Sequence, residues 1–118
     1  MPASETTVKE LKIASAAALD KLGENLVALD VSEPFALADA FMIVSAKNER
    51  QVQAVADHIE EQLHRAGVRL RTMEGKEAGR WVLLDFGDLV VHVMHEQERE
   101  FYAIERLWRD CPIIDLAP

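Results

Sequence analysis

Two short apolar segments near the middle of the C-terminal half alternate in a way that predicts a β-hairpin. Residues 82–86 and 89–94 are rich in β-branched and aromatic side chains, which strands prefer. Gly87-Asp88 stands between them, and glycine in the first of two turn residues suits a type II′ turn. Side chains alternate along both strands, so one face of the hairpin is wholly apolar and we expect it to be core. That face carries Val82, Leu84, Phe86, Leu89, Val91 and Val93.

The opposite face of the hairpin mixes apolar side chains with polar ones. It carries Trp81, Leu83 and Asp85 opposite Met94, His92 and Val90. Asp85 and His92 lie diagonally across this face, at a separation that side chains can partly bridge. Three interpretations are open here. The two residues could form a hydrogen-bonded pair beneath a covering helix, act as polar contacts of a docking surface with Trp81 as its aromatic anchor, or serve catalysis.

Apolar spacing upstream of the hairpin predicts two helices and three strands. A first helix begins at Thr6 or Thr7, with a capping box between Thr7 and Glu10, and runs to about Leu22, where Gly23 ends it. A second helix begins after Asn48 as N-cap and ends near Ala66, with Gly67 closing it. Strands are predicted at residues 25–31, 40–46 and 68–73, and the strand–helix–strand unit implies a right-handed parallel crossover.

A last helix is predicted over residues 97–109, directly after the hairpin. Its spacing places Phe101, Ile104 and either Leu107 or Trp108 inward. Tyr102, Glu105 and Arg109 would lie on an adjacent stripe, with Glu105 and Arg109 as an i,i+4 ion pair. The chain is therefore predicted to be one α+β domain over residues 1–118, with the element order α-β-β-α-β-β-β-α, a core over residues 6–109 and an extended tail over 110–118.

Charge narrows the classes of partner. The chain has 118 residues, 21 of them acidic and 13 basic, for a formal net charge of −8. No basic stripe is visible, so direct nucleic-acid binding is not expected as the main function. An acidic surface favours a basic partner, although solubility alone is an equally ordinary reason for acidity.

Other simple chemistries find little support in the sequence. Cys111 is the single cysteine, so neither an intramolecular disulfide nor a cysteine metal cluster is expected, and a reducing cytoplasm is the natural compartment. The segment 74–79 has two glycines but not the spacing of a P-loop or a dinucleotide fingerprint. No segment is apolar enough to span a membrane, and residues 1–22 have the pattern of neither a signal peptide nor a transit peptide.

Three stretches resemble the ribosomal silencing factor family, also called Iojap-like. They are ALDV at residues 28–31, the strand ADAFMIVSA with the following helix VQAVADHIEE, and WVLLDFGDLVVHVMHEQEREFYAIERLW at residues 81–108. The resemblance covers roughly residues 6–109. It implies a mixed five-stranded sheet flanked by three helices, with a likeness to nucleotidyltransferase-type folds.

The resemblance also implies a function and a set of residues. Members of the family bind a large-subunit ribosomal protein at the intersubunit face and sterically block small-subunit joining, which damps translation under nutrient limitation. A homodimer in the unbound state is part of the same expectation, and neither a cofactor nor a metal is implied. The family positions expected to bind the partner are Glu74, Trp81, Asp85, Asp88, His92, Arg99, Tyr102 and Glu105, whereas Gly87, Leu107 and Trp108 are expected to be structural.

An enzyme of the nucleotidyltransferase type is the alternative. That chemistry needs a glycine–serine turn for phosphate and paired carboxylates for magnesium. Here Ser45 has no preceding glycine, and Asp85 and Asp88 are not an alternating pair. His92 and His95 fall on opposite sides of a regular strand, which makes a poor metal pair. We therefore expect a binding module rather than an enzyme.

Overall fold

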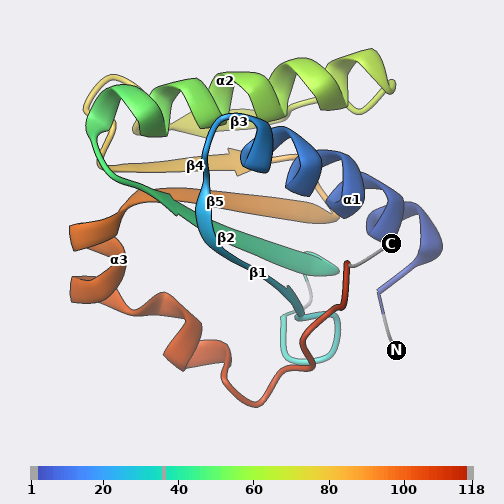
Figure 1. Ribbon diagram of the computed structural model, residues 1–118. Coiled ribbons are helices and arrows are strands. Elements are labelled where there is room, and N and C mark those ends of the chain that lie inside the picture. Colours follow the sequence, from blue (N-terminus) through green and yellow to red (C-terminus); the bar gives the residue numbers. More distant parts are fainter. Residues whose placement is uncertain (1–2, 36, 117–118) are drawn as a thin grey trace.

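Five strands form one mixed sheet in the order β1-β2-β5-β4-β3 (Figure 1). This computed structural model describes residues 3–35 and 37–116. β2 and β5 pair in parallel, and the other neighbours pair antiparallel. The strands are β1 Glu24–Asp30, β2 Ala40–Ala46, β3 Thr72–Glu74, β4 Trp81–Asp85 and β5 Leu89–His95. The expected mixed five-stranded sheet is confirmed.

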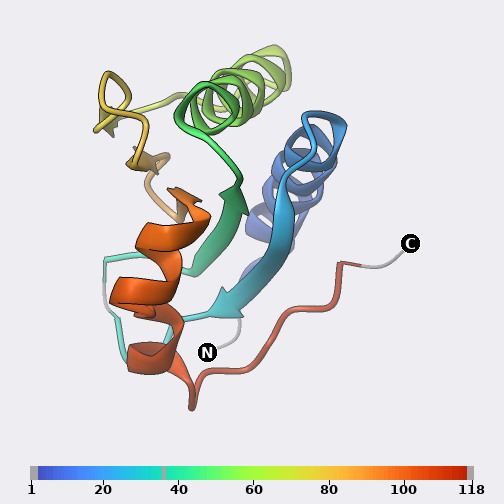
Figure 2. The same cartoon turned by 60° about the vertical axis from the view of Figure 1, so that its left-hand side comes forward.

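Helices cover both faces of this sheet and create two separate apolar clusters. α1 Glu5–Asp20 and α2 Glu49–Arg65 lie side by side on one face, and α3 Glu96–Tyr102 lies with the short 3-10 helix η1 Ile104–Trp108 on the other (Figures 1 and 2). The cluster beneath α1 and α2 is the larger one. The cluster beneath α3 and η1 is smaller and is built around Phe41, Ile43, Met94 and Ile104.

The predicted hairpin is confirmed in register and in face. Phe86 donates its backbone N–H to the carbonyl of Leu89 at 2.9 Å, and β4 and β5 pair as expected from the turn. Gly87 has φ +96°, a left-handed conformation that a glycine adopts without strain. The six apolar residues of the predicted core face are all buried, and all belong to the larger cluster.

The first helix begins earlier than predicted and has a different cap. Ser4 is the N-cap, and its hydroxyl accepts the backbone N–H of Thr7 at 3.2 Å. The predicted capping box between Thr7 and Glu10 is therefore wrong. Thr7 is instead fully buried, and its hydroxyl donates to Asp39 at 3.0 Å.

The first helix also ends on a different residue than predicted. Leu22, not Gly23, takes the left-handed conformation, with φ +65°. Leu22 donates its N–H to Leu19 and Gly23 donates to Ala18, the two bonds of a Schellman motif. Gly23 is thus the residue after the left-handed position.

The second helix agrees with the sequence, but the strand after it is much shorter than predicted. Asn48 caps α2 by accepting the N–H of Gln51, and Gly67 follows its end with φ +85°. Regular strand is confined to Thr72–Glu74, so only Thr72 and Met73 of the predicted strand 68–73 belong to it. β3 runs parallel to β2, but β5 and β4 lie between them.

The predicted last helix is broken into two pieces. α3 ends at Tyr102, and Ala103 takes a left-handed conformation, φ 45° and ψ 48°, before η1 begins. The inward prediction is confirmed for Ile104, is met by Trp108 rather than Leu107, and is wrong for Phe101. The exposed fractions of Phe101 and Leu107 are 80% and 79%. Trp108 is half-buried in the smaller cluster.

The tail runs along the free edge of β1. Pro112 accepts the backbone N–H of Asp30, and Ile114 donates to Ala28, each at 2.8 Å. Ile113 forms an isolated antiparallel bridge with Leu29. The described part of the tail therefore covers backbone groups that an edge strand would otherwise expose.

Candidate functional site

Hydrogen bonds and ion pairs fix α3 against the end of the hairpin. His95 is the N-cap of α3, and its Nδ1 accepts the backbone N–H of Gln97 at 3.1 Å. Arg80, the residue before β4, donates from Nη2 to Oε1 of Glu98 at 2.8 Å. The His95 ring also lies 3.6 Å from a carboxylate oxygen of Glu49, at the start of α2. α3 is thus held to the sheet by its first turn, while its second turn is left with no buried residue.

Several aromatic and aliphatic side chains lie on α3, on η1 and at the start of β4, and most of them are exposed. We call this group the docking surface: Trp81, Phe101, Tyr102 and Leu107. The ring of Tyr102 packs on Trp81 with centroids 5.1 Å apart, and Phe101 packs on Tyr102 at 4.9 Å. Tyr102 is 51% exposed, and Phe101 and Leu107 are about four-fifths exposed. Aromatic residues that are fixed by one another yet open to water are typical anchors of a protein interface.

His92 lies beneath this surface as a buried neutral residue. It is 7% exposed, and its Nδ1 accepts the indole N–H of Trp81 at 3.1 Å. Burial lowers the pKa of His92 from 6.5 to about 4. Because Nδ1 accepts, the proton of the neutral ring sits on Nε2, and that buried atom has no hydrogen-bond partner among the described residues. The hydrogen bond from Trp81 to His92 therefore fixes the orientation of the Trp81 ring.

The predicted pair of Asp85 and His92 does not form. Asp85 accepts the backbone N–H of Gly87 at 2.8 Å and so serves the hairpin turn, while the hydrogen bond of His92 goes to Trp81. The interpretation of these residues as a hydrogen-bonded polar pair is wrong. Because the two residues are only diagonal neighbours on adjacent strands, each side chain bonds to a closer group instead.

The other predicted site residues fall into two places. Arg99 and Glu105 lie beside the docking surface, with Nε and Oε1 3.5 Å apart, so the predicted pair of Glu105 with Arg109 is wrong. Arg99 also donates to the hydroxyl of Ser45 at 3.4 Å. Asp88 is exposed in the hairpin turn and Glu74 is exposed on β3 at the sheet edge. Five of the eight predicted positions thus come together around α3 and η1: Trp81, His92, Arg99, Tyr102 and Glu105.

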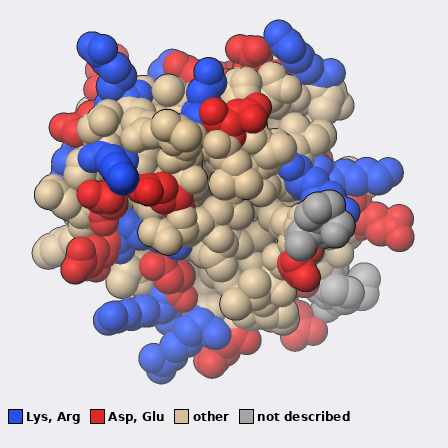
Figure 3. Space-filling model, in the orientation of Figure 1, with Lys and Arg blue, Asp and Glu red and all other residues tan. Residues whose placement is uncertain are grey.

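Charged side chains are unevenly spread over the molecule in the orientation of Figure 1. Figure 3 shows uncharged surface, polar as well as apolar, over the middle of that view, with lysine, arginine, aspartate and glutamate side chains mostly toward its rim.

Two observations concern nucleophiles and metal ligands. Ser45 is buried and donates its hydroxyl to the carbonyl of Glu24 at 3.1 Å, so it is not poised as a nucleophile. Among the described residues, no group of three or more histidine, cysteine, aspartate or glutamate side chains could hold a metal ion. No described helix is long and apolar enough to cross a membrane.

Two exposed residues of the docking surface did not follow from the sequence. Phe101 is predicted inward, and Leu107 is one of two alternatives for the inward stripe and is expected to be structural, yet both side chains are exposed. The left-handed Ala103 between them rotates the chain, and no local sequence signal such as a glycine or asparagine marks that position.

Comparisons with known proteins agree with one another. A sequence model of the family described as "Ribosomal silencing factor during starvation" matches residues 4–118. The "Ribosomal silencing factor RsfS" of Bacillus subtilis is 46% identical over 106 residues, which are 90% of this chain and 90% of the relative. A crystal structure of a Chromobacterium violaceum protein has a TM-score of 0.83 and 39% identity, covering 85% of this chain and 83% of the other. A mouse protein named "Mitochondrial assembly of ribosomal large subunit protein 1" is 29% identical over 71% of this chain and 38% of its own length.

Proposed function

Because the chain belongs to the ribosomal silencing factor family, we propose that it binds a basic protein on the intersubunit face of the large ribosomal subunit and sterically blocks joining of the small subunit. Translation is damped as a result, above all under nutrient limitation. The chain does this in the cytoplasm without bond-making, cofactor or metal, and with little direct contact to nucleic acid. The name of the mouse relative, which refers to the large ribosomal subunit, supports the choice of subunit.

The half-buried Trp81 and the exposed Tyr102 that packs on it carry this proposal. Both faces of the sheet are covered, but the smaller cluster ends in aromatic rings that stay exposed, Tyr102 at 51% and Phe101 at 80%, and exposed apolar groups of this kind mark interaction sites. Glu105 lies beside the docking surface and would meet lysine or arginine of the partner, with Glu74, Asp85 and Asp88 as more distant acidic contacts and Arg99 holding Glu105. His92 holds Trp81 in place. Acidic residues outnumber basic ones 21 to 13 in the chain, which suits a basic protein better than ribosomal RNA.

The direct test is sedimentation of the protein with purified large subunits. Trp81→Ala removes a central aromatic anchor, and we expect Kd to rise roughly thirtyfold, about 2 kcal/mol. Trp81→Phe keeps a smaller aromatic ring against Tyr102 and removes the N–H that His92 accepts, so it should bind more tightly than Trp81→Ala.

Two controls separate binding from folding. Leu19→Ser changes an exposed aliphatic residue on α1, on the other face of the sheet, and should leave Kd unchanged. Circular dichroism should show that all three variants keep the fold. Unchanged sedimentation of folded Trp81→Ala would refute the assigned surface, and normal subunit joining in the presence of saturating wild-type protein would refute the steric mechanism.

A further inference from the structure

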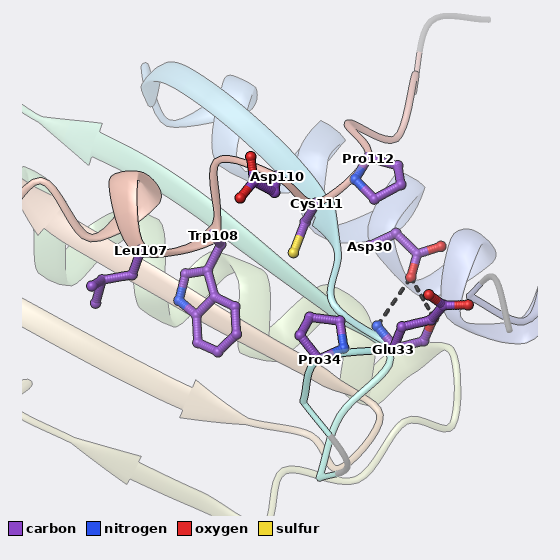
Figure 4. Close-up of a pocket in the computed structure, with 9 residues that line it drawn as sticks. Asp30, Glu33, Pro34, Leu107, Trp108, Asp110, Cys111 and Pro112 are labelled. Carbon is purple, nitrogen blue, oxygen red and sulfur yellow. Dashed lines mark hydrogen bonds between the residues drawn. The ribbon is translucent and has the colours of Figure 1, made fainter.

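An open groove lies beside the docking surface, between η1, the start of the tail and the loop after β1. Its volume is about 740 Å³ (Figure 4). Leu107 and Trp108 of η1 form one wall, and Pro34 and Pro112 lie across from them. The Trp108 ring is fixed, because it packs edge-on against Phe35 and Phe41 with centroids 5.6 and 5.2 Å apart. The groove therefore has rigid apolar walls.

Negative charge surrounds these walls. Asp30, Glu33 and Asp110 line the groove, and no lysine or arginine is among its lining residues. Asp30 is held in place by Ser32, whose backbone N–H donates to its carboxylate at 3.0 Å. In Figure 4 the sulfur of Cys111 points into the space between Trp108 and Pro34. Burial, and then the nearby carboxylates of Asp110 and Asp30, raise the pKa of the Cys111 thiol, as expected where the potential is negative.

The groove is continuous with the docking surface through one residue. Leu107 belongs to both, and it is 79% exposed. η1, which carries Leu107 and Trp108, directly follows α3 and lies next to it (Figure 1). The groove is thus within reach of the same partner chain.

We propose that this groove binds a lysine or arginine side chain on a basic segment of the large-subunit partner protein. The aliphatic part of that side chain packs on Trp108 and the two prolines, and its cation lies in the negative potential of Asp110, with Asp30 and Glu33 farther along the groove. The indole face of Trp108 adds a cation–π contact when the cation lies within about 6 Å of the ring. This inference rests on the proposed function, because it takes its partner from it, but it concerns a separate site.

The first test measures large-subunit binding by groove variants of the full chain. Asp110→Asn removes one carboxylate from the rim, and we expect Kd to rise about three- to tenfold at low salt and to become less sensitive to salt. Glu77→Gln makes the same charge change on an exposed residue outside the groove and should leave Kd unchanged. Equal Kd values for Asp110→Asn and Glu77→Gln, with Trp81→Ala still defective, would overturn the groove and leave the proposed function intact. If none of the three variants binds the large subunit more weakly, both the groove and the proposed function are refuted.

The second test uses the single cysteine as a probe of the groove. A cationic and an anionic methanethiosulfonate reagent are each reacted with Cys111, and their rates are normalised to those with a simple thiol. We expect the cationic reagent to be favoured several-fold, and Asp110→Asn, but not Glu77→Gln, to reduce that preference. Equal normalised rates in the wild-type protein would show that the groove does not select cations and would overturn the proposal. A change in oligomeric state of Asp110→Asn without ribosomes would identify a second copy of the chain as the occupant and overturn it as well.

Discussion

His92 illustrates how one buried residue links packing to pH. Its ring accepts the indole N–H of Trp81 and packs edge-on against Phe41, with centroids 5.3 Å apart. A proton added to Nδ1 would remove that hydrogen bond and place a charge in an apolar cluster. The neutral ring is therefore the form that the fold requires.

This requirement predicts a loss of stability in mild acid. The pKa of His92 is about 4 in the folded chain and 6.5 in an ordinary environment, so the unfolded chain binds the proton first as pH falls. The neutral, buried His92 contributes about 3 kcal/mol to the free energy of unfolding; this contribution is fully present above pH 6.5 and is lost progressively as the pH falls toward 4. Chemical denaturation of wild type and His92→Gln at several pH values measures it, because glutamine can accept from Trp81 but does not titrate.

A second histidine variant provides the control for that experiment. His64 is exposed near the end of α2, and His64→Gln should keep the wild-type dependence on pH. The difference in free energy of unfolding between wild type and His92→Gln should shrink from pH 7 to pH 4. A difference that stays constant over this range would show that His92 titrates normally.

At the scale of elements, the break at Ala103 shapes the docking surface. A continuous helix from 97 to 109 would turn Phe101 and Leu107 toward the sheet, whereas the left-handed residue leaves both outside. Alanine in this conformation costs about 1 kcal/mol relative to its preferred regions, because its Cβ crowds the backbone. The packing of Ile104 and Trp108 into the smaller cluster offsets that cost.

The sign of the change in free energy of unfolding caused by Ala103→Gly distinguishes the broken helix from a continuous one. Ala103→Gly should raise the free energy of unfolding by about 0.5 kcal/mol, since glycine adopts positive φ without strain but loses more entropy on folding. In a continuous helix the same change would lower it by about 1 kcal/mol. Urea denaturation measures the change. Ala16→Gly, at an exposed position within α1, is the matched control and should be destabilising.

Elements set by local chemistry could be predicted from the sequence, and elements set by tertiary contacts could not. The hairpin register follows from Gly87 and from strict alternation, and the start of α2 follows from the cap Asn48. The short β3 did not follow from its apolar pattern, because an edge strand is regular only where its single neighbour extends. For the candidate site, Trp81 and Tyr102 come together as the resemblance implied. The bond from Gly87 to Asp85 is a local turn contact that the strand pattern did not reveal, and the exposure of Phe101 depends on the break at Ala103.

The two faces of the sheet differ in how completely helices cover them. The face beneath α1 and α2 holds most of the buried apolar residues and accounts for the stability of the fold. The face beneath α3 and η1 is only partly covered and ends in exposed rings. A partly covered apolar face on a free protein is also suited to pairing with a second copy of itself.

We therefore expect a homodimer in the absence of ribosomes that dissociates when the large subunit is bound. If the docking surface serves both purposes, the double substitution Phe101→Ser and Leu107→Ser removes its two most exposed apolar side chains and should weaken both dimerisation and subunit binding by at least tenfold. Light scattering of the free protein and sedimentation with large subunits measure the two effects. Leu19→Ser on the opposite layer should change neither. Weakened subunit binding in a variant that still dimerises would place the two contacts on different surfaces, because a shared surface cannot lose one and keep the other.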